Sequence, residues 1–372
     1  MNRKEIFEEI NSHKNSSRLL IDFASTGVSG ITFKTYKELR KYLGFSTITK
    51  PGIIDTFQGL VYPDEDILSF LGIDFRRVCL SNIYEENFGQ NEFYDEFGIK
   101  FKKSSGYYDT ILNPLREIDV KSFDLDDFKL PKIKKDQRIK ELRETIVRYK
   151  DSGYLLVGDF VTGGILGLCE RLRGMENFLM DLLVNKDLAE RLMKKVNVFY
   201  KEVNRIFLEI AGPYLNVVTL ADDLGMQDSL LFSPDLYRNL IKPRHRELID
   251  FIKSLTDAKV FFHSDGSIYE LIPDLIEIGV DILNPIQKSA RNMEIKKVKK
   301  EFGDNIIFWG GLDTQKIIPF GNSKEVEKEI KDTIKILGKD GGYVFSPGHN
   351  LQSDISPERI IKMFELANSF RS

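Results

Sequence analysis

Eight short segments of the chain are almost continuously apolar and rich in β-branched or aromatic residues. Polar residues or glycine bound each of them, as is typical of strands. Most do not alternate between apolar and polar positions, so they match strands buried on both faces, as in a parallel sheet. The segments span residues 19–23, 77–80, 154–160, 216–220, 259–263, 281–284, 305–309 and 342–345.

Amphipathic helices are predicted between these segments, because apolar residues recur there at three- and four-residue steps. In 186–210, for example, Leu188 and Leu192 share one face. Ser233 followed by Pro234 is typical of a helix N-terminus, with serine as the cap and proline at the first helical position. The other helices are predicted over 135–149, 234–251, 267–278, 293–302, 324–337 and 357–369.

Strands that alternate with helices indicate an α/β protein, and eight strands favour a (β/α)8 TIM-type barrel over an open sheet. The length of 372 residues fits one barrel with insertions. The stretch at about 30–135 lacks the regular spacing and contains four prolines. We therefore predict a single barrel domain over 1–372, elaborated at 30–135 by inserted helices and loops that pack on the barrel.

Composition narrows the class of protein further. Hydrophobic residues at 42% and charged residues at 30% exclude a disordered chain. A net charge of −3 argues against a nucleic-acid partner, and two cysteines rule out a disulfide framework. The chain has neither a secretory leader nor an apolar run near the roughly 20 residues that span a bilayer. We expect a cytoplasmic protein without a membrane partner, and leave its oligomeric state open.

Polar side chains gather just after the predicted strands, at the barrel end where TIM-barrel enzymes carry their chemistry. An aspartate at such a position can equally cap the helix that follows, so the catalytic and capping interpretations both stay open. The residues are Asp22, Asp159, Asp222, Asp223, His263, Asp265, Asn284, Gln287, Asp313 and His349.

The segment FFHSDG at 261–266 carries the sharpest local signal. Side chains two apart on a strand point to the same side, so His263 and Asp265 are expected to face one way. With His349 they could form a His/carboxylate/His metal site that has an open position. The alternative is two hydrogen-bonded histidines and a capping aspartate. A non-haem iron triad uses the same residue types, but its usual all-β scaffold does not match the alternating pattern.

Three further residues have simpler interpretations. His245 lies among charges in PRHRELIDF (243–251) and is expected on a solvated helix face. Cys169 is interpreted as a small buried apolar residue. Glu170, beside it, either faces the rim of the barrel or is a surface acid.

Four segments taken together resemble the uroporphyrinogen decarboxylase superfamily, closely over about 150–370 and loosely over the first 150 residues. This superfamily includes the true decarboxylases and zinc-dependent corrinoid methyltransferases. The resemblance implies a (β/α)8 barrel, in agreement with the strands counted above. The segments are 230–253, 261–287, 308–321 and 341–360.

Two departures from the decarboxylase pattern place the chain nearer to the methyltransferases. The decarboxylases carry an R-Q-A-G-R-Y element whose arginines meet the substrate carboxylates. The corresponding stretch here, DFASTGVSGI at 22–31, has no arginine. Glu170 stands where the decarboxylases have a tyrosine after the third strand, although their Gly-His pair is kept at Gly348 and His349.

The methyltransferase resemblance implies a metal site at the same three residues. That branch binds zinc with an H-x-C motif and a later cysteine. His263 matches the histidine, Asp265 stands at the first cysteine, and His349 lies at or near the second. Zinc accepts histidine and carboxylate ligands, and another divalent ion would also fit such a set.

The function implied is metal-dependent transfer of a methyl group between a small-molecule thiol or other heteroatom and a corrinoid. The corrinoid would be carried by a separate protein, because the chain has no D-x-H-x-x-G element. The alternatives are a metal-free decarboxylase of uroporphyrinogen or another acid, and a catalytically degenerate barrel that binds a small ligand. Candidate catalytic residues are Asp222, Asp223, Glu170 and Asp313, and candidate substrate-binding residues are Asp22, Asp159, Asn284 and Gln287.

Overall fold

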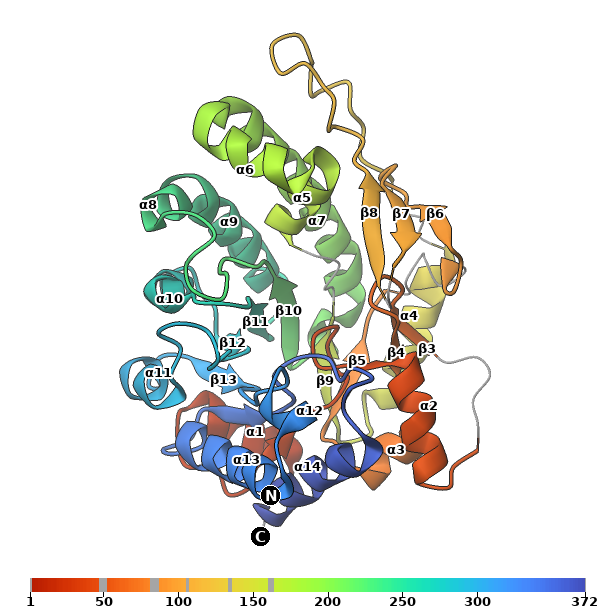
Figure 1. Ribbon diagram of the computed structural model, residues 1–372, viewed down its shortest axis with the longest axis vertical. Helices are drawn as coiled ribbons and strands as arrows, with labels where there is room; N and C mark the ends of the chain where they lie inside the picture. Colours follow the sequence, from red (N-terminus) through yellow and green to blue (C-terminus); the bar gives the residue numbers. More distant parts are fainter. Residues whose placement is uncertain are drawn as a thin grey trace.

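The fold is centred on a parallel eight-stranded sheet that curves into a nearly closed barrel (Figure 1). The computed structural model describes residues 2–46, 52–80, 87–104, 107–132, 136–159 and 164–371. The strand order is β1-β14-β13-β12-β11-β10-β9-β5, and hydrogen-bonded neighbours are parallel. The strands are β1 (Leu20–Ile21), β5 (Phe75–Val78), β9 (Leu155–Gly158), β10 (Val217–Ala221), β11 (Lys259–His263), β12 (Ile282–Asn284), β13 (Ile307–Trp309) and β14 (Tyr343–Phe345).

Asp74 links the two ends of this sheet. Its backbone N–H donates to the Ile21 carbonyl at 2.9 Å, and its carboxylate accepts the Ile21 N–H at 2.9 Å. The carboxylate is fully buried and also pairs with Arg3, Arg18 and Arg371. One side chain thereby joins β1, the start of β5 and both ends of the chain, which lie together at the bottom of Figure 1.

The (β/α)8 prediction is confirmed, since each of the eight predicted segments overlaps one barrel strand. The second strand lies at Phe75–Val78 rather than 77–80. Two of its four residues are arginines, so its first half does not form an apolar run in the sequence. Arg76 is buried there because its guanidinium stacks 3.6 Å from the centre of the Tyr154 ring and pairs with Glu65. Residue 160, at the end of the third predicted segment, lies outside the described residues.

Helices follow most of the strands and cover the outside of the barrel (Figure 1). The helix predicted over 234–251 is divided into α8 (Pro234–Leu236), a π-helical turn η3 (Tyr237–Ile241) and α9 (Lys242–Lys253), because Pro243 has no N–H to continue the regular ladder. Residue 135, the predicted start of another helix, is outside the described ranges. The others are α4 (Asp136–Tyr149), α5 (Ile165–Arg173), α6 (Met175–Val184), α7 (Lys186–Ala211), η2 (Gly212–Tyr214), η4 (Tyr269–Leu271), α10 (Ile272–Glu277), α11 (Ile295–Phe302), α12 (Ile317–Phe320), α13 (Ser323–Leu337) and α14 (Pro357–Ser369).

The region at 30–135 contains more sheet than the predicted helices and loops. Besides α2 (Phe33–Tyr42) and α3 (Glu65–Phe70), it forms two three-stranded antiparallel sheets and supplies barrel strand β5. Phe57, in the turn between β3 and β4, packs on Phe101 of β7, with ring centres 4.4 Å apart. The sheets are β2 (Ile31–Thr32), β4 (Leu60–Tyr62) and β3 (Gly52–Asp55), and β6 (Glu92–Tyr94), β7 (Lys100–Lys103) and β8 (Tyr108–Leu112).

The lower part of the barrel is filled by apolar side chains. Phe75, Phe261 and Trp309 pack their rings together, with centres 4.6 Å apart for Phe75 and Trp309 and 5.5 Å apart for Phe261 and Trp309. Helix α1 (Arg3–Asn11) adds Phe7 and two isoleucines to this inner cluster. Most of the candidate site residues lie instead at the opposite rim. Within the described residues, no helix is both long and apolar enough to cross a membrane.

Candidate metal centre

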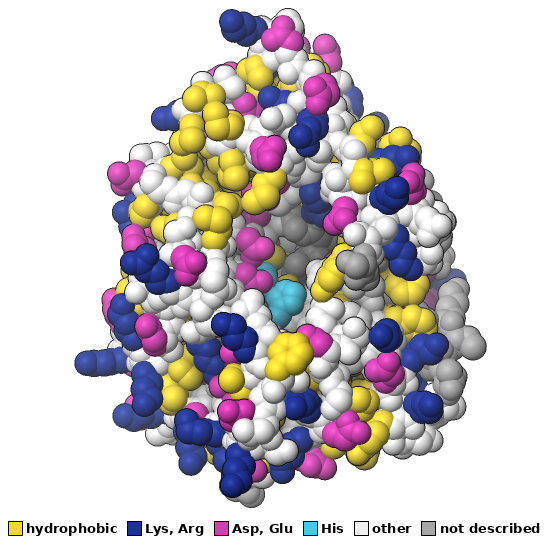
Figure 2. Space-filling model, in the orientation of Figure 1, with side chains coloured by type: hydrophobic (Ala, Val, Ile, Leu, Met, Phe, Trp, Pro, Cys, Tyr) yellow, Lys and Arg dark blue, Asp and Glu magenta, His cyan; other side chains and the backbone are white. Residues whose placement is uncertain are grey.

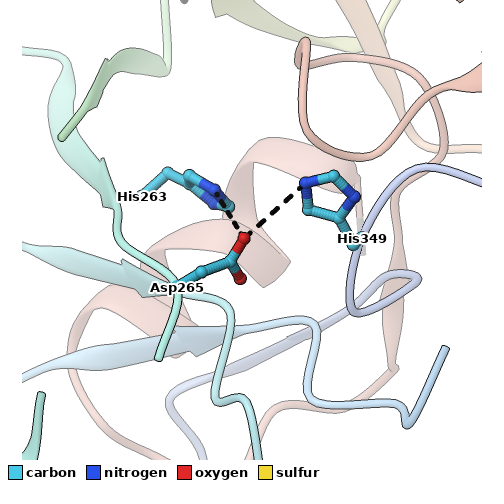
Figure 3. A group of neighbouring side chains, drawn as sticks. All are labelled: His263, Asp265 and His349. Carbon is cyan, nitrogen blue, oxygen red and sulfur yellow. Dashed lines mark ion pairs between the residues drawn. The ribbon is translucent and has the colours of Figure 1, made fainter. Parts of the chain in front are cut away.

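The candidate metal centre lies at the C-terminal end of β11. Phe261 points into the barrel core, and His263, two residues later, points the same way. Asp265 follows in the next loop, and His349 comes from the loop between β14 and α14 (Figure 3). Asp265 Oδ2 lies 3.6 Å from His263 Nε2 and 3.7 Å from His349 Nε2. The structure thus brings the three predicted ligands together, each with one ligand atom within 4.8 Å of the others.

Asn284, at the end of β12, fixes the ring of His263. Its Nδ2 donates to the Trp309 carbonyl at 2.9 Å, which leaves Oδ1 as the acceptor. This oxygen lies 2.6 Å from His263 Nδ1, so Nδ1 carries the proton of that hydrogen bond. His263 Nε2 is then the nitrogen that faces Asp265 and that a metal ion would meet.

Charge interactions set the protonation of the three side chains. Burial lowers the pKa of His263, but the nearby carboxylates and the Asn284 hydrogen bond outweigh it and raise the pKa to about 9. Burial raises the pKa of Asp265, but its interactions with the two histidines lower it overall. Burial lowers the pKa of His349, so this ring is neutral near pH 7. A metal ion would replace the proton on His263 Nε2 and use the free electron pair of His349.

The donor set suits a divalent metal ion. Two imidazole nitrogens and one carboxylate oxygen are ligands that zinc accepts, and three protein ligands leave a fourth position for substrate or water. Sites of this composition are typical of catalytic rather than structural zinc. The group His263/Asp265/His349 could therefore hold a catalytic metal.

Replacing Asn284 tests the support that it gives to His263. We expect Asn284→Ala to weaken zinc binding about 10–100-fold, because His263 loses the acceptor that holds its ring and its tautomer. Competition with a chelating dye measures the affinity. Asn305→Ala, at an exposed position before β13, should bind zinc as the unaltered protein does. Equal affinities for the two variants would show that other contacts orient His263.

Asp222, a candidate catalytic residue, is buried with its carboxylate fully engaged. Its oxygens accept the N–H groups of Leu166 at 3.1 Å and Gly167 at 3.0 Å, at the start of α5. Oδ2 also lies 2.8 Å from His245 Nε2, on α9. The carboxylate caps α5 and ties it to α9. The prediction of a solvated helix face for His245 is wrong, because this ring is buried against Asp222 while the neighbouring Arg246 faces solvent.

A cavity of about 390 Å³ opens beside the candidate metal centre and is lined by all three of its residues. Figure 2 shows a histidine at the lower edge of a hollow, with acidic side chains beside it. The cavity also brings together four of the other predicted site residues, Asp159, Glu170, Asp222 and Asp223. The structure therefore collects both the candidate metal ligands and most of the predicted catalytic acids around one cavity.

Three arginines that the sequence analysis missed line the same cavity: Arg77, Arg138 and Arg171. Arg77 Nε donates to Asp159 Oδ2 at 2.8 Å, and Arg138 lies 3.9 Å from a carboxylate oxygen of Glu96. Arg77 had a signal in the sequence, because a charge within a buried strand requires a partner. Arg138 and Arg171 lie on helices, where nothing in the sequence separates them from surface cations.

Asp223 and Gln287 support the loop that carries Asp265. Asp223 Oδ1 accepts the backbone N–H of Asp265 at 2.9 Å and lies 4.0 Å from His263 Nε2. Gln287 Oε1 accepts the N–H of Gly266 at 2.7 Å. Gln287 lines a second cavity of about 250 Å³, which shares Asp265 and His349 with the first. The candidate metal centre therefore lies between two cavities.

Asp22 and Asp313 occupy different surroundings from those expected of site residues. Asp22 is buried in the barrel, where Oδ2 accepts the Trp309 Nε1–H at 3.0 Å, and it lines neither of the two cavities. Asp313 lines the second cavity, but its Oδ1 accepts the N–H groups of Gln315 and Lys316. Asp313 thus closes the turn that leads into α12, whose N-cap is Lys316.

The fold and the site define a (β/α)8 barrel with a candidate metal centre at its C-terminal rim. A model of the uroporphyrinogen decarboxylase (URO-D) family matches residues 95–370. The chain therefore belongs to the uroporphyrinogen decarboxylase family.

Among curated relatives, the uroporphyrinogen decarboxylase of Pelodictyon phaeoclathratiforme is 23% identical over 345 residues, which cover 89% of this chain and 88% of the relative. That of Chlorobium phaeobacteroides is 23% identical over 186 residues, 48% of this chain and 50% of the relative. Several of these matches thus span half of the relative or less. A methyltransferase from Methanosarcina mazei has a TM-score of 0.68 at 15% identity, with both chains covered completely, and so shares the fold.

Proposed function

We propose that this protein is a metal-dependent methyltransferase, with zinc as the expected ion. It moves a methyl group between a small-molecule thiol or other heteroatom and a corrinoid carried by a separate protein. The observation that carries the proposal is the His263/Asp265/His349 group, which offers three metal ligands at a cavity large enough for a small substrate. A methyltransferase with the same fold over its whole length is consistent with this assignment.

Some residues of the site would hold the metal ion, and others position those ligands. A bound zinc ion would lower the pKa of a coordinated thiol, so that a thiolate forms near neutral pH. His263 Nε2, an Asp265 oxygen and a His349 nitrogen would hold the ion. Asn284 holds the ring of His263, and Asp223 holds the backbone of Asp265.

The corrinoid would arrive on a partner protein, because the chain has no D-x-H-x-x-G element. Helix α6 presents Met180, Leu183 and Val184 to solvent. Figure 2 shows hydrophobic side chains gathered on one side of the hollow, and an exposed apolar patch of this kind supports docking of a protein.

In the transfer, sulfur forms a bond to the methyl carbon while the cobalt–carbon bond breaks and its electron pair stays on cobalt.

Free methylcobalamin and a simple thiol test the proposal without the partner. We expect zinc-loaded protein to demethylate methylcobalamin in the presence of 2-mercaptoethanol or homocysteine, with the methyl thioether detected by mass spectrometry. Removal of the metal by a chelator should abolish the reaction, and added zinc should restore it. If zinc-loaded protein does not exceed the protein-free rate with these thiols, the proposal fails and a barrel that binds a ligand without catalysis is favoured.

The second candidate is a metal-free decarboxylase of the uroporphyrinogen type. The names of the curated relatives and the three cavity arginines favour it, because a substrate with many carboxylates needs cations. However, eight of the described lining residues are acidic, and both Arg77 and Arg138 already face carboxylates. Chromatography of uroporphyrinogen incubated with the protein decides between the two, since decarboxylated products from metal-free protein would replace the methyltransferase proposal.

A further inference from the structure

Glu170 stands out among the acids of the metal-centre cavity because its carboxyl group has no hydrogen-bond or ion-pair partner among the residues that the structure describes. It lies on α5 between the buried Cys169 and Arg171, and it lines the same cavity as the three candidate metal ligands. Within the described part of the chain it makes neither a hydrogen bond nor an ion pair, whereas Asp159, Asp222 and Asp223 each make at least one. A partly buried carboxyl group without such bonds is less well stabilised in its charged form than one in open water.

Glu170 and the candidate metal centre share Asp223 as a charged neighbour. Burial raises its pKa, and repulsion from Asp222 and Asp223 raises it further, to about 7, while Arg171 opposes the shift. Asp223 in turn lies 4.0 Å from His263 Nε2. A carboxyl poised in this way exchanges a proton near neutral pH, which suits an acid or base in catalysis.

We infer that Glu170 is the proton acceptor for the thiol substrate, an inference that rests on the proposed function. In this step the S–H bond breaks, the proton forms an O–H bond on the Glu170 carboxylate, and the electron pair stays on sulfur as the nucleophile. In the reverse direction the protonated carboxyl returns the proton to sulfur.

The neighbouring acids are committed to other contacts. Both oxygens of Asp222 accept hydrogen bonds at the start of α5, one of them also facing His245, and Asp265 faces both histidines of the metal centre. Asp223 holds the backbone of Asp265, and its side chain is 63% exposed. Glu170 is therefore the cavity acid best placed to keep the proton inside the site rather than release it to solvent.

Proton release on thiol binding tests the inference. Protein loaded with Co²⁺ in place of zinc is titrated with 2-mercaptoethanol at pH 7.5, and the near-ultraviolet thiolate band reports the bound thiolate. Calorimetry in buffers of different ionisation enthalpy counts the protons released. We expect the unaltered protein to release fewer protons per thiol than Glu170→Gln, because the negative charge of a bound thiolate raises the pKa of the Glu170 carboxyl further and favours the proton on it. Glu170→Gln should release about one proton per thiol, because binding of a deprotonated ligand to a metal otherwise sends its proton to solvent.

Two further variants separate the role of the carboxylate from a structural effect. Glu170→Asp keeps an acceptor and should restore part of the proton retention. Glu176→Gln, on the neighbouring α6 with its side chain 91% exposed, should release as few protons as the unaltered protein. All variants should bind the metal fully.

The outcomes of the experiment are distinguishable. Equal proton release by the unaltered protein and by Glu170→Gln, with the thiolate band present in both, would overturn the role of Glu170 and leave the methyltransferase proposal intact. Absence of the thiolate band from the metal-loaded unaltered protein would overturn both.

Discussion

Removing either histidine of the candidate metal centre is expected to abolish metal binding while the barrel stays folded. Protein purified without added metal should hold about one zinc or other divalent ion per chain, as measured by elemental mass spectrometry. His263→Ala and His349→Ala should hold almost none, because two remaining ligands bind zinc far more weakly than three. The loss of zinc affinity in these two variants should exceed the roughly 10–100-fold loss expected for Asn284→Ala, because Asn284 only holds the ring of His263 and is not itself a candidate ligand.

A control variant and a fluorescence measurement separate the loss of a ligand from unfolding of the barrel. His13→Asn alters another of the four histidines, outside the candidate metal centre, and keeps a residue that tolerates the positive φ of 50° found there; it should retain the metal. The fluorescence of Trp309, the single tryptophan, reports whether the barrel core is intact. Full metal occupancy in either alanine variant, with the core intact, would show that the three residues are not the ligands.

Replacing Asp74 is expected to give the largest loss of stability. The fully buried carboxylate faces Arg3, Arg18 and Arg371 and accepts the Ile21 N–H between the two ends of the barrel sheet. Asp74→Ala leaves three guanidinium groups without their shared counter-charge, so we expect a loss of about 3–5 kcal/mol. Urea unfolding followed by Trp309 fluorescence measures it.

Matched variants separate charge from hydrogen bonding at this position. Asp74→Asn keeps an oxygen that can accept the Ile21 N–H, and should lose less than Asp74→Ala. Asp228→Ala, at an exposed loop position, should change the free energy of unfolding by less than about 0.5 kcal/mol. If Asp74→Ala unfolds at the same urea concentration as Asp228→Ala, the ion cluster does not hold the barrel ends together.

The barrel and the candidate ligands were accessible from the sequence for local reasons. Strands buried on both faces leave an apolar run of a few residues that needs no knowledge of the partner strand. His263 and Asp265 lie two residues apart at the end of such a run, so the alternation of side chains predicts their shared direction. His349 was recognisable because it follows another strand end of the same barrel.

Contacts between distant segments remained hidden. The charged residues around His245 predict a surface position. Only the packing of α9 against the end of β10 buries its ring against Asp222. The small sheets of the 30–135 region depend on pairing between strands of two to five residues, which are too short to leave a clear periodic pattern. Arg138 and Arg171 enter the cavity because of where their helices pack.

The sequence by itself therefore determined the fold class, the family resemblance and the three candidate metal ligands, since each depends on periodicity or on residues close together at a strand end. Only the tertiary structure decided that Asn284 orients His263, that Asp222 is a cap, and that Glu170 lines the metal-centre cavity without a hydrogen bond to any described residue. These properties arise where segments far apart in the chain meet, and burial there sets hydrogen bonding and pKa in ways that local sequence does not encode.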